Sequence, residues 1–185
     1  MVVCVAMLLD KVSVKINVDE YINDAKNKTK KEFVLKYNHP FLVKFSNSKD
    51  NLSKHELLFK TIVSEIKLAD ILNFSGSLSK IDEILEVKKT DRNLFLSKII
   101  VGRTSTQDII IDDIKISKFH AYFQIKDGRY YLCDPGSTNG TIIDNLKMDV
   151  STPVIINNNN VIRFADNSYT FFTPETAYET FRVYN

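Results

Sequence analysis

Residues 134–141 read DPGSTNGT, and they lie between two apolar runs that have the composition of β-strands. The proline, the two glycines and the asparagine are residues that tight turns favour, because they fix φ or tolerate a positive φ. A turn does not require the three hydroxyl side chains that crowd around the same bend. This surplus of hydrogen-bonding groups indicates a surface that binds a ligand.

Short apolar runs flank this turn on both sides, and turn signals separate them at intervals of roughly ten residues. Asp127-Gly128, between two runs of β-forming residues, is a strong hairpin signal. The pattern predicts an antiparallel β-sandwich. Its strands are expected at residues 84–87, 95–102, 108–111, 120–125, 130–134, 141–143, 154–156, 161–164 and 169–172. Thr173-Pro174 predicts a short helix in the C-terminal tail, with proline at the first helical position.

The N-terminal half has a mixed α and β pattern. Strands are expected at residues 12–18, 33–37 and 41–45, the first from strict alternation of apolar and polar residues. A helix is expected to begin at Ser53, which has capping-box spacing with Glu56. The basic run KNKTKK at residues 26–31 is interpreted as a solvated loop or helix face rather than a docking patch for an acidic partner.

These patterns predict a mainly β chain with two units. A small α+β domain of unknown role is expected at residues 1–74, and a small polar linker at residues 75–81. The β-sandwich is expected at residues 82–173, followed by a tail at residues 174–185.

Composition excludes several classes of protein. The 25 basic and 23 acidic residues nearly balance, which argues against a general nucleic-acid binder. Cys4 and Cys133 form neither a disulfide framework nor a metal-binding spacing, and the apolar run at residues 2–9 is too short to span a bilayer. An intracellular, cytoplasmic protein is expected, or a nuclear one in a eukaryote. No cofactor, metal or membrane partner is indicated, and no nucleophile elbow, Walker loop or zinc motif suggests an enzyme.

Three motifs, in their order and spacing, resemble the forkhead-associated (FHA) domain. They are Gly102-Arg103, Ser117-Lys118-Phe119-His120-Ala121 and Ser137-Thr138-Asn139-Gly140-Thr141. The resemblance extends over about residues 80–173. It implies a twisted sandwich of two antiparallel sheets with recognition loops at one end. It also implies that the loops bind peptides containing phosphothreonine.

The resemblance assigns roles that agree with phosphate chemistry. A phosphate carries nearly two negative charges and accepts hydrogen bonds from guanidinium, hydroxyl and N–H groups. Peptide binding is therefore expected from Arg103, Ser117, Lys118, Thr138 and Asn139, where the Asn139 amide holds the peptide backbone. Structural support of the site is expected from Gly102, His120 and Gly140. The chain departs from the family pattern after Thr141 and at Asn159-Asn160. These departures are expected to affect the local shape of the loops and not the phosphate contacts.

The expected function is therefore a phosphothreonine-dependent adaptor or signalling module whose partner is a threonine-phosphorylated protein. The alternative is a phosphate-independent scaffold or assembly component of a larger complex. Residues 1–74 are a candidate surface for a second partner or for self-association. An enzymatic function is expected much less than either of these two binding functions.

Overall fold

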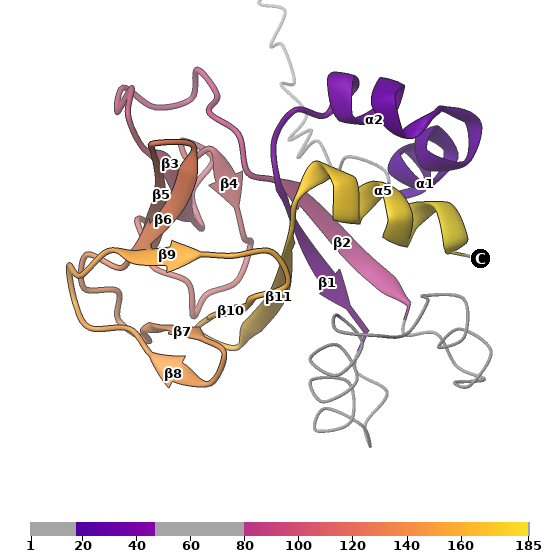
Figure 1. The fold of residues 1–185 in the computed structure, drawn as a ribbon. Helices are drawn as coiled ribbons and strands as arrows, with labels where there is room; N and C mark the ends of the chain where they lie inside the picture. Colours follow the sequence, from indigo (N-terminus) through magenta and orange to yellow (C-terminus); the bar gives the residue numbers. More distant parts are fainter. Residues whose placement is uncertain (1–17, 47–79, 185) are drawn as a thin grey trace, which may run out of the picture.

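The computed structural model describes residues 18–46 and 80–184, and it shows a mainly β protein (Figure 1). The described residues form three helices: α1 (Val18–Asn27), α2 (Lys30–Lys36) and α5 (Pro174–Val183). The strands are β1 (Phe41–Phe45), β2 (Ile81–Glu86), β3 (Ile99–Gly102), β4 (Ile109–Ile110), β5 (Ala121–Lys126), β6 (Arg129–Cys133), β7 (Thr141–Ile143), β8 (Leu146–Lys147), β9 (Val154–Ile156), β10 (Val161–Phe164) and β11 (Asn167–Phe172). None of the described helices is both long and apolar enough to cross a membrane.

The strands form two sheets that face each other. One sheet has the order β2-β1-β11-β10-β7-β8, and the other has the order β4-β3-β5-β6-β9. Neighbouring strands are antiparallel in every described pair except β3 and β4, which run parallel. The predicted β-sandwich is confirmed, and every strand predicted between residues 84 and 172 overlaps one in the structure.

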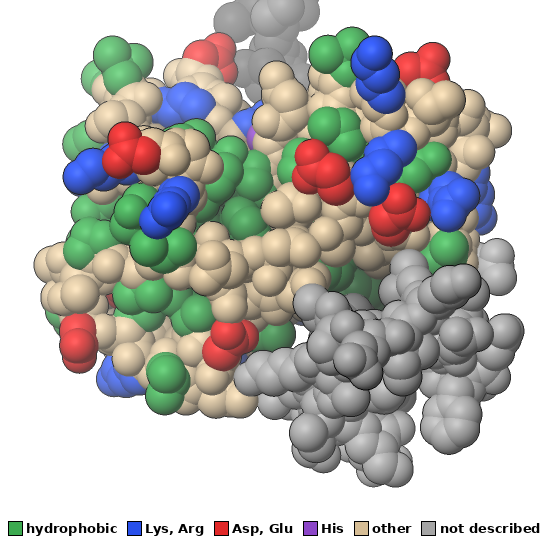
Figure 2. Space-filling view, in the orientation of Figure 1, with side chains coloured by type: hydrophobic (Ala, Val, Ile, Leu, Met, Phe, Trp, Pro, Cys, Tyr) green, Lys and Arg blue, Asp and Glu red, His purple; other side chains and the backbone are tan. Residues whose placement is uncertain are grey.

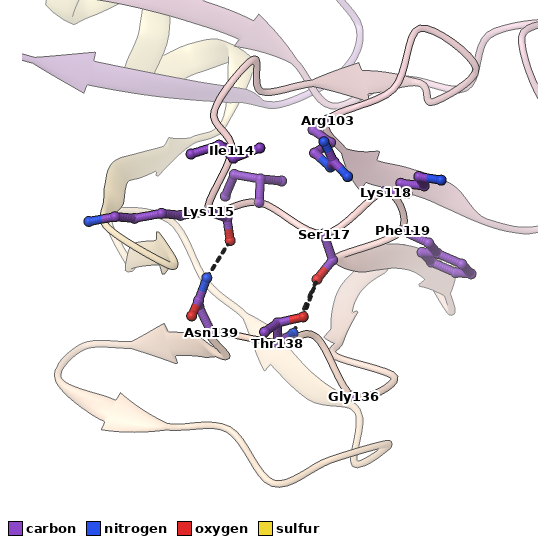
Figure 3. Close-up of a pocket in the computed structure, with 10 residues that line it drawn as sticks. Arg103, Ile114, Lys115, Ser117, Lys118, Phe119, Gly136, Thr138 and Asn139 are labelled. Carbon is purple, nitrogen blue, oxygen red and sulfur yellow. Dashed lines mark hydrogen bonds between the residues drawn. The ribbon is translucent and has the colours of Figure 1, made fainter.

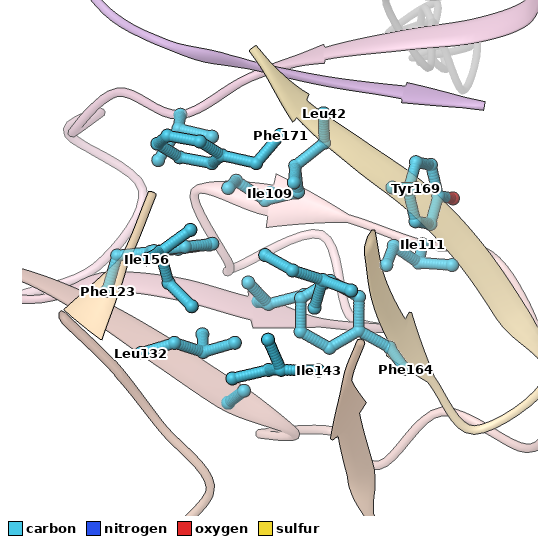
Figure 4. Packing of buried hydrophobic residues seen from close by; sticks show 14 of the residues in the cluster. Leu42, Ile109, Ile111, Phe123, Leu132, Ile143, Ile156, Phe164, Tyr169 and Phe171 are labelled. Atoms are coloured by element: carbon cyan, nitrogen blue, oxygen red, sulfur yellow. The ribbon is translucent and has the colours of Figure 1, made fainter. Parts of the chain in front are cut away.

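The core between the sheets consists of aliphatic and aromatic side chains from both (Figure 4). Because side chains alternate across a strand, the longer strands direct alternate residues into this core. The close-up shows Phe123 and Leu132 of one sheet packed opposite Phe164, Tyr169 and Phe171 of the other. This shared core fixes how the loops at the ends of the strands sit relative to one another.

A second apolar layer lies on the outer face of the six-stranded sheet. Helices α1, α2 and α5 cover the part formed by β1, β2 and β11 (Figure 1). Strand β1 is consequently buried on both faces. Its Leu42 points into the core between the sheets, whereas Phe41 and Val43 pack against Tyr21, Phe33 and other residues of the helical layer.

This arrangement differs from the predicted division of the chain into two separate units. Strand β1 lies between β2 and β11, so residues 41–45 are an integral part of the sandwich. The described segment 18–46 packs on the β-sheet and has no separate core within the described residues. Most of the predicted strand at residues 12–18, the helix from Ser53 and most of the linker predicted at residues 75–81 lie outside the described residues, whereas Ile81 begins β2.

The strand predicted at residues 33–37 is wrong, because most of this segment belongs to α2. Thr29 accepts a hydrogen bond from the Glu32 backbone N–H, and the Glu32 carboxylate accepts one from the Thr29 backbone N–H. This capping box starts the helix and outweighs the β propensity of Phe33 and Val34. The predicted C-terminal helix is confirmed as α5, with Thr173 as its N-cap.

One buried carboxylate organises the loop between β2 and β3. Asp108 Oδ1 accepts hydrogen bonds from Lys89 Nζ at 3.0 Å and from the Thr90 backbone N–H at 2.8 Å. Its Oδ2 accepts from Asn93 Nδ2 at 2.6 Å and from the Ile100 backbone N–H at 2.8 Å. Burial alone would raise the pKa of Asp108, but these donors lower it, so the side chain stays ionised. The loop is thereby attached to the edge of the five-stranded sheet.

The position of Leu42 generates a stability prediction. Leu42 is fully buried (0% exposed), whereas Leu35 on α2 is 79% exposed. We expect Leu42→Ala to lower the free energy of unfolding by about 2–5 kcal/mol, because it leaves a cavity between the sheets. Leu35→Ala should change it by less than about 0.5 kcal/mol. Urea unfolding followed by circular dichroism measures both, and equal small effects would contradict the placement of β1.

Candidate functional site

An open cleft of about 450 Å³ lies where three loops meet at one end of the sandwich (Figure 3). The loops join β3 to β4, β4 to β5, and β6 to β7. The structure brings all five predicted binding residues into this cleft. Its lining consists of Arg103, Ile114, Lys115, Ile116, Ser117, Lys118, Phe119, Gly136, Thr138 and Asn139. Residues separated by more than thirty positions in the sequence therefore share one surface.

Two hydroxyl groups face each other across the cleft. Ser117 Oγ lies 3.4 Å from Thr138 Oγ1 and also accepts a hydrogen bond from the Thr138 backbone N–H at 3.1 Å. Figure 3 shows Arg103 on the same side of the cleft as Ser117. The Arg103 backbone N–H donates to Ser117 O at 3.2 Å, which joins the first loop to the second. Guanidinium and hydroxyl groups thus converge at one place.

The cleft is electropositive, because Arg103, Lys115 and Lys118 line it without a carboxylate among the lining residues. Lys115 forms an ion pair with Asp166, which raises the pKa of Lys115. Within the described part of the chain, neither Arg103 nor Lys118 forms an ion pair. An unpaired guanidinium beside hydroxyl groups is suited to an anionic ligand.

The amide nitrogen of Asn139 makes a contact within the protein. Asn139 Nδ2 donates a 2.7 Å hydrogen bond to Lys115 O, which joins the β6–β7 loop to the β4–β5 loop (Figure 3). The nitrogen is thus used within the protein. A contact with a peptide backbone would fall to the carbonyl oxygen Oδ1, which accepts hydrogen bonds from N–H groups.

His120 lies beneath the cleft and joins the same two loops. Its Nδ1 accepts a hydrogen bond from the Ser117 backbone N–H at 3.1 Å, so the ring proton resides on Nε2. Nε2 lies 3.2 Å from Gly140 O and donates to it. Burial lowers the pKa of His120 and keeps the ring neutral, although Gly140 O and Asp134 oppose this shift. This geometry fits the supporting role that the resemblance implies.

The two glycines that were predicted to support the cleft have distinct reasons to be glycine. A Cβ on Gly102 would lie 2.2 Å from Lys118 O, so only glycine lets the first two loops approach this closely. Gly140 has a φ of 77°, a conformation that other L-residues rarely adopt. Both positions shape the backbone of the site without contacting a ligand through a side chain.

Asp134 is a supporting residue that sequence reasoning missed. Its Oδ1 accepts hydrogen bonds from the backbone N–H groups of Gly136 and Ser137 at 2.9 and 2.6 Å. Its Oδ2 accepts from the hydroxyls of Ser137 and Thr141 at 2.7 and 2.8 Å. Two of the three hydroxyls in DPGSTNGT therefore hold the turn together, and only Thr138 presents its hydroxyl to the cleft. The sequence signal that could have identified this role of Asp134 is the Asp-x-x-Ser spacing at the start of the turn.

These bonds generate a prediction about acid stability. Burial would raise the pKa of Asp134, but the hydrogen bonds outweigh it and lower the pKa. Asp134 therefore stabilises the fold fully above its unfolded pKa of about 3.9, and this contribution is lost as pH falls below that value. We expect Asp134→Asn to cost about 1.5–3 kcal/mol at pH 7, and the difference from the unmodified protein to shrink below about pH 4.

Denaturant unfolding at several pH values measures this difference. Asp127→Asn is the matched control, because Asp127 is exposed in the hairpin between β5 and β6 and accepts no hydrogen bond from a described side chain. A constant difference between Asp134→Asn and the unmodified protein from pH 7 to pH 3 would contradict the assignment.

Comparisons with known proteins identify one family. Residues 99–165 match the family model of the FHA domain. The chain is 42% identical over 43 residues to the oxoglutarate dehydrogenase inhibitor of Corynebacterium glutamicum, which is 23% of this chain and 30% of that protein. It is 38% identical over 48 residues to the glycogen accumulation regulator GarA of Mycolicibacterium smegmatis, which is 26% of this chain and 30% of that protein.

Among solved structures, one similar chain is Mycobacterium tuberculosis EmbR in complex with a low-affinity phosphopeptide. It has 26% identity and a TM-score of 0.39, over 42% of this chain and 20% of EmbR. The chain thus spans less than a third of each relative named here. The matched segment includes Arg103, Ser117 and Thr138 with the loops that carry them. Residues 99–165, the segment that carries the cleft, are therefore similar to an FHA domain.

Proposed function

We propose that this protein is a phosphothreonine-dependent binding module that recognises phosphorylated partner proteins through the cleft at the end of the sandwich. The observation that carries this proposal is the Arg103 guanidinium, which has no carboxylate partner among the described residues and lies beside the facing hydroxyls of Ser117 and Thr138. The proposed ligand is the dianionic phosphate of a phosphothreonine side chain.

The chemistry of the cleft matches the needs of such a phosphate. Arg103 offers a planar guanidinium that donates two parallel hydrogen bonds to phosphate oxygens. The hydroxyl of Ser117 donates a further hydrogen bond, and Lys118 adds a positive charge at the rim. The weak 3.4 Å contact between Ser117 and Thr138 is easily exchanged for bonds to a ligand. Because His120 and Asp134 hold the loops in place, little ordering is required on binding.

The names of the relatives agree with a regulatory role. One is called an inhibitor of oxoglutarate dehydrogenase and another a regulator of glycogen accumulation. We infer that this chain likewise acts by binding other proteins and not by catalysis. The similarity to each of these two relatives covers about 30% of the relative's length. The role of the whole protein and the identity of its partner and of the kinase are therefore proposals as well.

A phosphate-independent scaffold is the second candidate. It is favoured by the helical layer, which adds a surface outside the family match to one face of the sheet. A scaffold of this kind needs no unpaired cation in the loops. The two candidates therefore differ in whether Arg103 matters for binding.

Arg103→Ala tests the proposal directly. We expect the full chain to bind a phosphothreonine peptide library and not the same library with plain threonine. Arg103→Ala should weaken binding at least about tenfold, because charge-assisted hydrogen bonds contribute about 1.5–3 kcal/mol. Its unfolding midpoint should stay unchanged, since the side chain is partly exposed and has no ion pair among the described residues. Fluorescence polarisation measures the affinities.

Arg129→Ala is the matched control. Arg129 is exposed beside the turn of the β5–β6 hairpin, at the end of the hairpin that lies away from the cleft. It should bind like the unmodified protein. Equal affinity for phosphorylated and plain peptides, or normal binding by Arg103→Ala, would move the assignment to the phosphate-independent scaffold.

A further inference from the structure

A chain of hydrogen bonds runs from strand β1 to the wall of the cleft that carries Asn139. Lys44 Nζ donates to Asn167 Oδ1 at 2.9 Å, and Asn167 Nδ2 donates to Asp113 Oδ2 at 2.7 Å. The other oxygen of Asp113, Oδ1, accepts the Lys115 backbone N–H at 2.8 Å. Lys115 O then accepts the 2.7 Å hydrogen bond from Asn139 Nδ2. We call these five residues the support chain.

The support chain begins outside the segment that matches the FHA family. Lys44 belongs to β1 and Asn167 is the first residue of β11, whereas the match covers residues 99–165. Strand β1 also carries Phe41 and Val43, which pack against the helical layer. Side chains therefore connect one wall of the cleft to a part of the protein that the family match does not include.

The turn between β10 and β11 holds the same wall by two further contacts. The Ala165 N–H donates at 3.1 Å to Gly140 O, the oxygen that His120 also contacts. Asp166 forms an ion pair with Lys115 Nζ. Ala165 has a φ of 52°, which is unfavourable for a residue other than glycine. The fold thus maintains a strained turn where that turn contacts the β6–β7 and β4–β5 loops.

Lys44 determines which way the Asn167 amide faces. An ammonium group has only donors, so it requires the amide oxygen. With Oδ1 turned to Lys44, the Nδ2 group faces Asp113, whose ionised carboxylate can only accept. The Lys115 N–H and the Asn167 amide lower the pKa of Asp113, which keeps this carboxylate ionised at neutral pH. Each donor in the support chain therefore has one acceptor, and the amide has one favoured orientation.

Lys44 differs in this respect from the lysines of the helical layer. Figure 2 shows basic and acidic side chains close together over that layer, where Lys30 forms an ion pair with Glu179. Exposed ion pairs of this kind contribute little to stability. Lys44 is half-buried and donates to a neutral amide oxygen. Its contact therefore orients a neighbouring side chain and does not neutralise a charge.

We propose that Asn167 and Lys44 are positioning residues of the phosphothreonine cleft. They hold the β4–β5 loop at Asp113, and that loop holds the Asn139 amide nitrogen at Lys115 O. The Asn139 amide is thereby fixed, and its Oδ1 is presented in one orientation to a peptide N–H. This inference rests on the proposed function and adds two residues that contact no ligand themselves.

The test measures two properties of the full chain. They are the affinity for a phosphothreonine peptide enriched from the library and the nuclear magnetic resonance signals of the Asn139 side-chain amide in the free protein. Asn167→Ala should shift the Asn139 signals, because the loop loses its contact at Asp113. It should also weaken peptide binding about threefold to tenfold, the effect of about one hydrogen bond.

Two further variants identify the group that acts. Asn167→Asp keeps an acceptor for Lys44 but has no donor for Asp113, so it should behave like Asn167→Ala. Lys44→Met keeps the apolar stem of the side chain and removes only the ammonium group, so the fold should be preserved. It should shift the Asn139 signals in the same direction and weaken binding by a smaller factor.

Asn158→Ala is the matched control. The Asn158 side chain also uses both ends of its amide, donating to Thr176 Oγ1 at 2.8 Å and accepting the Thr173 N–H at 3.0 Å. These contacts lie at the start of α5 and not at the cleft. Because distant sites act independently, this variant should leave the Asn139 signals in place and the affinity within about twofold.

The outcomes separate this inference from the proposed function. Unchanged Asn139 signals in Asn167→Ala and Lys44→Met overturn the inference and leave the phosphothreonine site intact. A loss of affinity in Asn167→Ala that is no larger than the loss in Asn158→Ala overturns it as well. Equal binding of phosphorylated and plain peptides by the unmodified protein overturns the proposed function and the inference together.

Discussion

A buried neutral imidazole holds the recognition end of this protein together. His120 accepts the Ser117 N–H on one side of its ring and donates to Gly140 O on the other, at 3.1 and 3.2 Å. These two contacts set the spacing between the loop that carries Ser117 and the turn that carries Thr138. A charged ring would have no acceptor at Nδ1, and its burial would be costly. The arrangement of the cleft therefore depends on His120 remaining neutral, which its lowered pKa favours.

Two buried carboxylates extend this support to the neighbouring surfaces. Asp134 collects the backbone and hydroxyl donors of the 134–141 turn, which forms one wall of the cleft. Asp108 does the same for the β2–β3 loop. In both cases a loop is shaped by donors that converge on one ionised side chain, and its outward residues remain available to a ligand. Each of these two loops is thus held in place by the protein itself.

The strands of the β-half were predictable because alternation and turn residues are local signals, and the three motifs located the cleft. Three features were not predictable in the same way. The strand expected at residues 33–37 is part of a helix, because a capping box at Thr29 and Glu32 outweighs local β propensity. Strand β1 joins the sandwich through partners that are distant in the sequence. The division of hydroxyls between Asp134 and the cleft depends on side-chain direction within one turn, which composition does not encode.

The most direct test of the account is a nuclear magnetic resonance titration of the full chain with a phosphothreonine peptide and its unphosphorylated counterpart. The account predicts that the Arg103 side-chain Nε–H signal and the backbone amide signals of Ser117 and Thr138 shift with the phosphorylated peptide and stay in place with the other. Shifts confined to the helical layer, or identical shifts with both peptides, would contradict a phosphate site formed by these three loops.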